Sequence, residues 1–176
     1  MYKNYNKICS NGGFLLKKVV LADDNYIVSE GIKLNIDWNE LNAEIVLIAK
    51  SGQEVLNYII DNHVDLIITD IEMPNLNGIS LSREAIKINP YIKIILISAY
   101  DKFEYAKQAV SIGVCDYIEK PIDYDFLYKK IKSSFEIIDR EQRNLSIVKE
   151  SRQLMITKFF QELLYFSTDK TLGYFD

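Results

Sequence analysis

Histidine is nearly absent from this chain, which has a single one, His63, among 176 residues. It stands between a helical pattern and a strand pattern, where a solvent-facing loop residue is expected. Because the chain has only this one histidine, catalytic triads and two-histidine metal sites are excluded. The two cysteines, Cys9 and Cys115, show no metal-binding spacing, and Cys115 falls in an apolar run typical of a buried strand. Cysteine used in this way fits a reducing, cytoplasmic location.

An excess of positive charge and a long apolar run are also missing. The chain has 21 Lys and Arg against 25 Asp and Glu, a net charge of -4, which argues against a basic nucleic-acid-binding face. No apolar run approaches the roughly 20 residues that a membrane-spanning helix needs. Residues 1–13 are polar and lack a signal-peptide core, and we expect residues 1–16 to be a disordered leader, an expression remnant or the result of a misplaced start.

Short apolar runs rich in β-branched residues alternate with helical patterns over residues 17–139. Strands are expected at Lys18–Ala22, Glu44–Ile48, Leu66–Thr69, Lys93–Ile97 and Val114–Ile118. Helices are expected at Ile27–Asp37, Gln53–Asn62, Ile79–Ile88 and Lys102–Ile112. This alternation predicts an α/β fold, a flavodoxin-like (βα)5 three-layer sandwich whose five parallel strands follow the order 2-1-3-4-5.

Capping and turn signals support these boundaries. Ser51–Glu54 has the capping-box pattern that opens a helix, and Asp101–Glu104 offers a similar start. Gly113 stands where a helix should stop, and Asn89–Pro90 closes another helix. Asn77–Gly78 predicts a tight turn.

Polar residues follow four of the expected strands. The pair Asp23–Asp24 ends the first run, Asp70 the third, Ser98 the fourth and Lys120 the fifth. Parallel sheets place their ligand sites beyond the carboxyl ends of the strands, so these side chains should meet at one rim. Such a set suits a divalent cation beside a phosphoryl group on a carboxylate, and Asp24 and Asp70 should then lie within about 8 Å of each other.

The C-terminal segment, residues 140–176, has a different pattern. No proline or glycine interrupts the chain from Ile122 to Asp169, which predicts a long helix that starts near Asp123 and outruns the domain. A rough apolar seam, interrupted by Arg152, is formed by Leu145, Val148, Met155, Phe159 and Leu163. We expect this helix to bind a partner or a second copy, or else to pack back on its own domain, with a frayed tail at residues 168–176.

These motifs together resemble the receiver domain of bacterial two-component response regulators. The matching residues are Asp23-Asp24, Asp70 in D-I-E-M-P-N-L-N-G, Ser98-Ala99-Tyr100, Tyr117 and Lys120-Pro121. The likeness covers residues 17–140, and residues 98–106 and 158–164 further resemble receivers attached to an AraC-type helix-turn-helix domain. No such DNA-binding domain follows here, so we expect an excised fragment, a truncated gene product or a receiver that works alone.

The resemblance implies a phosphorylation switch rather than an enzyme, one that catalyses only its own phosphotransfer and dephosphorylation. Asp70 would accept a phosphoryl group from a sensor histidine kinase. Mg²⁺, or Mn²⁺ in its place, would be held by Asp24, Asp70 and the backbone carbonyl of Glu72, with Asp23 nearby or bound through water.

The resemblance also assigns roles around the phosphoryl group. Lys120 would contact its oxygens, aimed inward by a cis peptide bond to Pro121, and Ser98 would hydrogen-bond it. Tyr117 would be the switch aromatic, moving together with Ser98. Glu72 and Tyr100, each two residues beyond a site residue, would tune hydrolysis of the phosphoryl group.

Plainer interpretations remain open for the same residues. Asp23–Asp24 also suits a helix cap, Lys120 a surface loop, and Ser98 and Tyr117 ordinary strand positions. An aspartyl phosphohydrolase and an interaction module with a decayed site are the other functional hypotheses.

For the switch, we expect homodimerisation, no membrane association and no specific DNA binding by this fragment. The full-length parent would bind DNA and control transcription. The alternative is a stand-alone or truncated receiver that acts through protein contacts only.

Overall fold

The computed structural model describes residues 16–99 and 103–169, so the predictions for Tyr100 and Asp101 lie outside the described residues. The chain divides into two compact units, Met1–Glu136 and Ile137–Asp176. The first unit contains the expected sheet, and the described part of the second is the later portion of one helix. The domain boundary expected between residues 139 and 140 stays a prediction.

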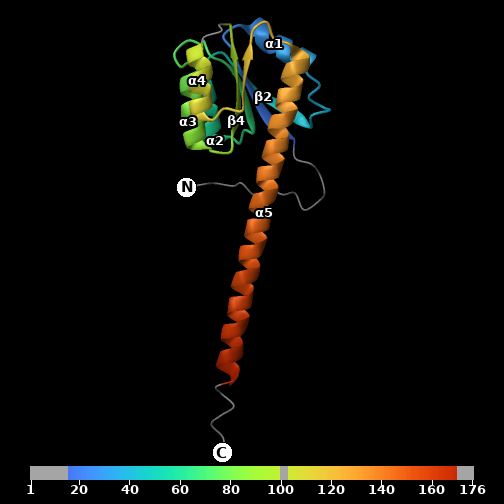
Figure 1. The fold of residues 1–176 in the computed structure, drawn as a ribbon, viewed down its shortest axis with the longest axis vertical. Helices are drawn as coiled ribbons and strands as arrows, with labels where there is room; N and C mark the ends of the chain where they lie inside the picture. The colour runs from blue at the N-terminus through green and yellow to red at the C-terminus, as the bar shows by residue number, and fades with distance from the viewer. Residues whose placement is uncertain (1–15, 100–102, 170–176) are drawn as a thin grey trace, which may run out of the picture. The chain divides into compact units, whose positions relative to one another are not determined.

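A five-stranded parallel sheet forms the first unit and confirms the α/β fold and the strand order β2-β1-β3-β4-β5 (Figure 1). Its strands are β1 Lys17–Ala22, β2 Ala43–Ala49, β3 Leu66–Asp70, β4 Lys93–Ser98 and β5 Asp116–Glu119. The helices are α1 Tyr26–Asn35, α2 Gly52–Asp61, α3 Gly78–Ile88, α4 Phe103–Ile112 and α5 Tyr124–Asp169. The helices α2, α3 and α4 cover one face of the sheet, and α1 with the first turns of α5 covers the other.

Both faces of the central strands are buried, which explains their unbroken apolar sequences. All five residues of β3 are buried, and so are five of the six residues of β4. Leu127, Ile131 and Phe135 of α5 are buried as well. A parallel strand that is covered on both faces has no solvent side, so it shows no polar alternation. The same burial forces polar side chains of these strands towards the strand ends.

Local signals account for most element boundaries. Ser51 is the N-cap of α2, and its Oγ accepts a hydrogen bond from the Glu54 backbone N–H at 3.4 Å. Gly113 ends α4 with a φ of +84°, a left-handed conformation that favours glycine. The tight turn predicted at Asn77–Gly78 is wrong: Asn77 caps α3, and the left-handed residue of this loop is Asn75, with φ +65°.

The buried carboxylate of Asp65, just before β3, forms a hydrogen bond to the neighbouring strand β1. It is 6% exposed, and its Oδ2 accepts a hydrogen bond from the Lys18 backbone N–H at 2.8 Å. Its Oδ1 lies 3.1 Å from Nε2 of His63. Burial raises the pKa of Asp65, but the hydrogen bonds from His63 and Lys18 and the nearby positive charges outweigh it, so the pKa is lowered overall.

Replacing this carboxylate should destabilise the first unit in a pH-dependent way. We expect Asp65→Ala to lower the free energy of unfolding by about 1–3 kcal/mol at neutral pH, because the partly buried Lys18 N–H loses its acceptor. Since the folded-state pKa is lowered, the ionised carboxylate stabilises the fold above its ordinary pKa of about 4, and this stabilisation is lost as pH falls through the folded-state pKa.

Urea unfolding at several pH values checks this prediction, with the exposed Asp61, at the end of α2, replaced by alanine as the control. The gap in stability between wild type and Asp65→Ala should close as the pH drops below about 4. A stability difference between wild type and Asp65→Ala that stays constant down to that pH would contradict the stabilising role of the ionised Asp65 carboxylate.

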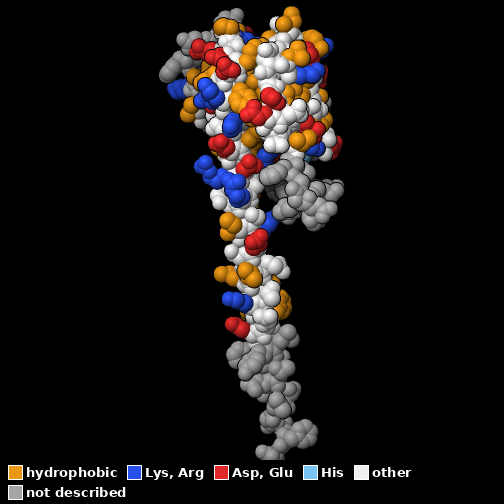
Figure 2. Space-filling model, turned by 90° about the vertical axis from the view of Figure 1, so that its right-hand side faces the viewer, with side chains coloured by type: hydrophobic (Ala, Val, Ile, Leu, Met, Phe, Trp, Pro, Cys, Tyr) orange, Lys and Arg blue, Asp and Glu red, His pale blue; other side chains and the backbone are white. Residues whose placement is uncertain are grey.

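The described part of the second unit is the helix over residues 137–169. Hydrophobic side chains lie exposed between charged ones along it (Figure 2). The exposed fraction is 63% at Val148, 59% at Phe159 and 49% at Leu163. Among the described residues, neither this helix nor any other is both long and apolar enough to cross a membrane.

Candidate functional site

Three carboxylates converge at the carboxyl edge of the sheet. Asp23 and Asp24 follow β1, and Asp70 is the last residue of the neighbouring strand β3. Each contributes one oxygen to a group in which all the oxygens lie within 4.8 Å of one another. Asp23 and Asp70 are 4% and 7% exposed, whereas Asp24 is exposed to solvent. The structure therefore brings together acids that are 47 residues apart in the sequence (23 and 70).

Lys120 lies between two of these acids. Its Nζ donates hydrogen bonds to Oδ2 of Asp23 at 2.9 Å and to Oδ2 of Asp70 at 3.1 Å. The other oxygen of Asp23 accepts the Asn25 backbone N–H at 2.8 Å. Both oxygens of Asp23 are thus engaged within the protein. One ammonium group balances part of the charge of three clustered carboxylates.

The pKa shifts of Asp70 and Lys120 follow from burial and from neighbouring charges. Burial raises the pKa of Asp70 and the negative charge of Asp23 adds to this, so the pKa stays raised although Lys120 opposes it. Burial lowers the pKa of Lys120, but its hydrogen bonds to Asp23 and Asp70 outweigh that effect and raise the pKa overall. Lys120 therefore carries its positive charge at neutral pH, in a site whose remaining negative charge favours a cation.

The donor set fits a hard divalent cation such as Mg²⁺. Mg²⁺ prefers carboxylate, carbonyl and water oxygens, and two oxygens on one Mg²⁺ lie at most about 4.2 Å apart. The separation limit of 4.8 Å among the oxygens of Asp23, Asp24 and Asp70 is close to that distance, so small side-chain rotations would suffice. The exposed position of Asp24 leaves one side of the cluster open to water.

The backbone around Asp70 is held tightly, in part by residues that sequence reasoning did not select. The Thr69 Oγ1 donates to the carbonyl of Asp70 at 2.9 Å, and the Gly78 N–H donates to the carbonyl of Ile71 at 2.9 Å. A Cβ at position 78 would lie 2.2 Å from that Asp70 carbonyl oxygen. Only glycine allows α3 to begin so close to Asp70. The Asn77–Gly78 dipeptide was the sequence signal, but it was interpreted as a turn.

The remaining predicted site residues occupy varied environments. Ser98, fully buried at the end of β4, accepts through its carbonyl the Lys120 N–H at 2.8 Å. The peptide bond between Lys120 and Pro121 is cis. Tyr117 is half-buried in β5, and Glu72 is exposed just beyond β3. The two strand-end backbones, at Ser98 and Lys120, are thus linked directly beside the acidic group.

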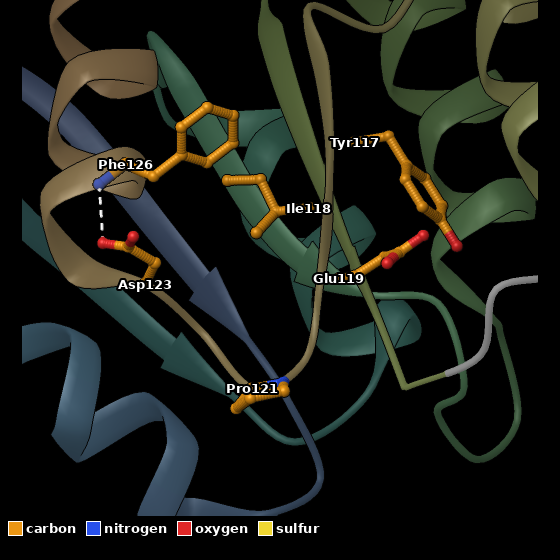
Figure 3. A pocket seen from close by; sticks show the side chains of 6 residues that line it. All are labelled: Tyr117, Ile118, Glu119, Pro121, Asp123 and Phe126. Atoms are coloured by element: carbon orange, nitrogen blue, oxygen red, sulfur yellow. Dashed lines mark hydrogen bonds between the residues drawn. The ribbon is translucent and has the colours of Figure 1, made fainter.

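A shallow hollow of about 380 Å³ lies along β5 and the start of α5 (Figure 3). Its lining residues are Tyr117, Ile118, Glu119, Pro121, Asp123 and Phe126. Tyr117 and Glu119 point to one side of the strand and Ile118 to the other, towards Phe126, as alternation along a strand requires. No member of the acidic group lines it, so this hollow is separate from the acidic site.

Comparison with known proteins decides the family. Residues 19–132 match the family described as the response regulator receiver domain. The chain belongs to this family. It is therefore the receiver domain of a two-component response regulator, a signalling switch, in agreement with the resemblance noted from its motifs.

Similar proteins support the same conclusion. The chain is 32% identical to YesN of Bacillus subtilis (strain 168), an uncharacterised transcriptional regulatory protein, over 76% of this chain and 35% of the relative. It is 38% identical to the transcriptional regulatory protein HptR of Staphylococcus aureus (strain NCTC 8325 / PS 47), over 61% of this chain and 42% of HptR. The chain thus spans less than half the length of these two curated relatives.

Solved structures agree with the fold. The receiver domain of AraT, a response regulator from Geobacillus stearothermophilus, is 38% identical with a TM-score of 0.68, covering 72% of this chain and 98% of that one. A two-component transcriptional regulator AraC from Clostridium phytofermentans ISDg is 27% identical with a TM-score of 0.67, again over 72% of this chain and 98% of that one. The transcriptional relatives agree with the AraC-type subgroup suggested by residues 98–106.

Proposed function

We propose that this receiver accepts a phosphoryl group on Asp70 from a sensor histidine kinase, in a reaction that requires Mg²⁺. The observation that carries the proposal is the position of Lys120, whose Nζ bridges Asp70 and Asp23 within the acidic group. A lysine on the surface of a loop would not be drawn between two buried acids. The contacts therefore favour a built site over the plainer interpretation of Lys120.

The chemistry assigned to Asp70 is nucleophilic. Its carboxylate oxygen attacks the phosphorus of the donor, and an oxygen–phosphorus bond forms while the donor's phosphorus–nitrogen bond breaks. The electron pair of the broken bond stays on the histidine nitrogen of the kinase. The product is an acyl phosphate on Asp70, and water later attacks its phosphorus to restore the carboxylate.

Asp24, Asp70 and the backbone carbonyl of Glu72 are the groups that would hold Mg²⁺, with Asp23 bound through water or nearby. The two hydrogen bonds that already occupy the oxygens of Asp23 support this outer role. When bound, Mg²⁺ offsets the negative charge of the carboxylate and of the phosphoryl group. Lys120 is placed to contact the phosphoryl oxygens as a point charge once Asp70 is modified.

The switch residues respond to that new charge. Ser98 at the end of β4 and Tyr117 in β5 lie on elements next to the site, and the Lys120 backbone joins their strands there. Phosphorylation then favours one of two existing arrangements of these residues and of α4. Glu72 and Tyr100 set the lifetime of the phosphoryl group.

The output of the parent protein is transcriptional control from the cytoplasm. YesN and HptR, named as transcriptional regulatory proteins, extend well beyond the aligned region, so the DNA-binding part would belong to a longer parent. This chain by itself, with a net charge of -4, does not bind DNA specifically. A second copy pairs with it through the receiver face around α4 and through α5, extended by residues 140–166.

A metal titration with acetyl phosphate as donor tests the proposal against the two functional alternatives. The switch predicts a labelled protein that survives long enough to isolate and that forms only with Mg²⁺. Release of phosphate without any labelled protein that can be isolated would instead indicate a phosphohydrolase, and no reaction at any Mg²⁺ concentration would indicate a decayed site.

Replacing Lys120 should separate metal binding from the response. We expect Lys120→Ala to bind Mg²⁺ with affinity close to wild type, because the acids remain, while the phosphorylation rate falls about 100-fold or more for want of charge at the phosphoryl oxygens. Lys130→Ala is the matched control, since Lys130 also forms a half-buried ion pair, with Asp116 at 2.9 Å, but lies outside the acidic group. Equal phosphorylation rates for Lys120→Ala and wild type would remove Lys120 from the site.

A further inference from the structure

We infer that the turn that joins β2 to α2, from the last strand residue Ala49 to the first helical residue Gly52, is a brace for the acidic site, and that Gly52 is the positioning residue within it. This inference rests on the proposed function, because the site it braces is the proposed metal and phosphoryl site. The turn itself contributes no carboxylate to the acidic group, whose described members come from the ends of β1 and β3.

The turn is hydrogen-bonded to both loops that follow β1 and β3, the strands at whose ends the acidic group lies. The Asp23 backbone N–H donates to the carbonyl of Ala49 at 3.1 Å. The Gly52 N–H donates to the carbonyl of Leu76, in the loop between β3 and α3, at 3.2 Å. That second loop also contains Glu72, whose carbonyl is the proposed third metal ligand. One turn thus fixes the backbones on both sides of the metal position.

The turn has its own internal support. Ser51 is 7% exposed and its Oγ caps the N–H of Glu54, while Oε2 of Glu54 accepts the Lys50 N–H at 2.9 Å. These two bonds fix the first turn of α2 and therefore the direction of the Gly52 N–H. Because Gly52 is the first helical residue, its N–H has no acceptor within the helix and is available to the loop.

Only glycine permits this approach. A Cβ at position 52 would lie 2.5 Å from the Leu76 carbonyl oxygen and 3.2 Å from the Leu76 Cβ. The closest atom belongs to the backbone, so it cannot rotate aside and the loop itself must move. Gly31 in α1 provides a contrast, because a Cβ there would meet the Oη of Tyr124 at the same 2.5 Å, and that side chain can rotate away.

Gly52→Ala and Gly31→Ala are therefore a matched pair of variants in which a methyl group is added to a helix. We expect Gly52→Ala to fold, to weaken Mg²⁺ binding measured by calorimetry about 10-fold, as losses of outer supports of metal sites do, and to slow phosphorylation chiefly at limiting Mg²⁺. Gly31→Ala should match wild type in both measurements. Wild-type Mg²⁺ affinity in folded Gly52→Ala would overturn the inference.

Amide hydrogen exchange in the wild-type protein gives a test that does not depend on a variant. Addition of Mg²⁺ should slow exchange of the Gly52 and Asp23 amides, because site and brace are coupled, and leave unchanged the Asn62 amide, which donates to Tyr58 at the other end of α2. A Gly52 amide that responds no more than that of Asn62 overturns the brace. Failure of wild type to bind Mg²⁺ or to accept label would overturn the proposed function, and this inference with it.

Discussion

Asp70→Asn should abolish covalent labelling by acetyl phosphate while leaving the domain folded. Asparagine has nearly the shape of aspartate but lacks the carboxylate that attacks phosphorus, so no acyl phosphate forms. Asp37→Asn, at an exposed position after α1, should label at the wild-type rate. Label on Asp70→Asn at an unchanged rate would mean that another residue is the acceptor.

The same variant should also gain stability in buffer free of Mg²⁺. The folded-state pKa of Asp70 is raised, mainly by burial, so the folded protein holds this proton more firmly than the unfolded chain does. Ionising the group as pH rises through that pKa therefore reduces stability, and Asn avoids the loss. We expect a higher melting temperature for Asp70→Asn at neutral pH and convergence with wild type as pH falls below about 4. A lower melting temperature at neutral pH would contradict this account of the site's electrostatics.

The second large effect concerns self-association through the helix over residues 137–169. The exposed apolar residues Leu145, Val148, Ile156, Phe159 and Leu163, which are the predicted seam with Ile156 in place of Met155, recur at intervals of three or four, with Arg152 filling the one gap. At about 100° per residue these positions form one stripe along the helix. An isolated helix with such a stripe is marginally stable in water and gains stability by covering it.

Phe159→Glu should therefore dissociate the proposed dimer. Burial of a phenylalanine contributes about 1.5–3 kcal/mol, and a dimer buries two, so the dissociation constant should rise by at least about 100-fold. Leu154→Glu is the matched control: Leu154 is 63% exposed against 59% for Phe159, but it lies about 140° around the helix from it.

Sedimentation velocity over a range of concentrations distinguishes these variants, and Arg152→Leu should shift the equilibrium the other way by removing the charge from the stripe. If Leu154→Glu dissociates the dimer as strongly as Phe159→Glu, the stripe is not the interface. If wild type remains a monomer at every concentration, with or without a beryllofluoride mimic of the phosphoryl group, the dimer proposal fails.

The fold could be predicted because its signals are local and mutually consistent. The strand runs are apolar because both faces are covered, and Ser51 and Gly113 mark helix ends through backbone requirements that their residue types reveal. The meeting of Asp70 and Lys120 at one edge of the sheet could be predicted for a related reason. In a parallel sheet, a polar residue that follows a buried apolar strand lies at the carboxyl edge of the sheet.

What sequence reasoning missed depends on distances between backbones that are far apart in sequence. Positions 78 and 52 require glycine because the carbonyl oxygens of Asp70 and Leu76 lie too close for a Cβ atom. No local sequence pattern indicates these contacts. Asn77 was misinterpreted because Asn-Gly favours turns, whereas here its side chain accepts the Ser80 N–H and opens α3. The hydrogen bond of Asp65 was missed because its partner, Lys18, lies in β1, far from Asp65 in the sequence.

The most direct test of the central claim is peptide mapping by mass spectrometry after wild-type protein is treated with acetyl phosphate and Mg²⁺. The account predicts one phosphoryl group per chain, carried by Asp70 in the peptide that contains residues 70–74, and none when Mg²⁺ is chelated. Modification of any other residue, or the same modification of Asp70 without a divalent cation, would contradict it.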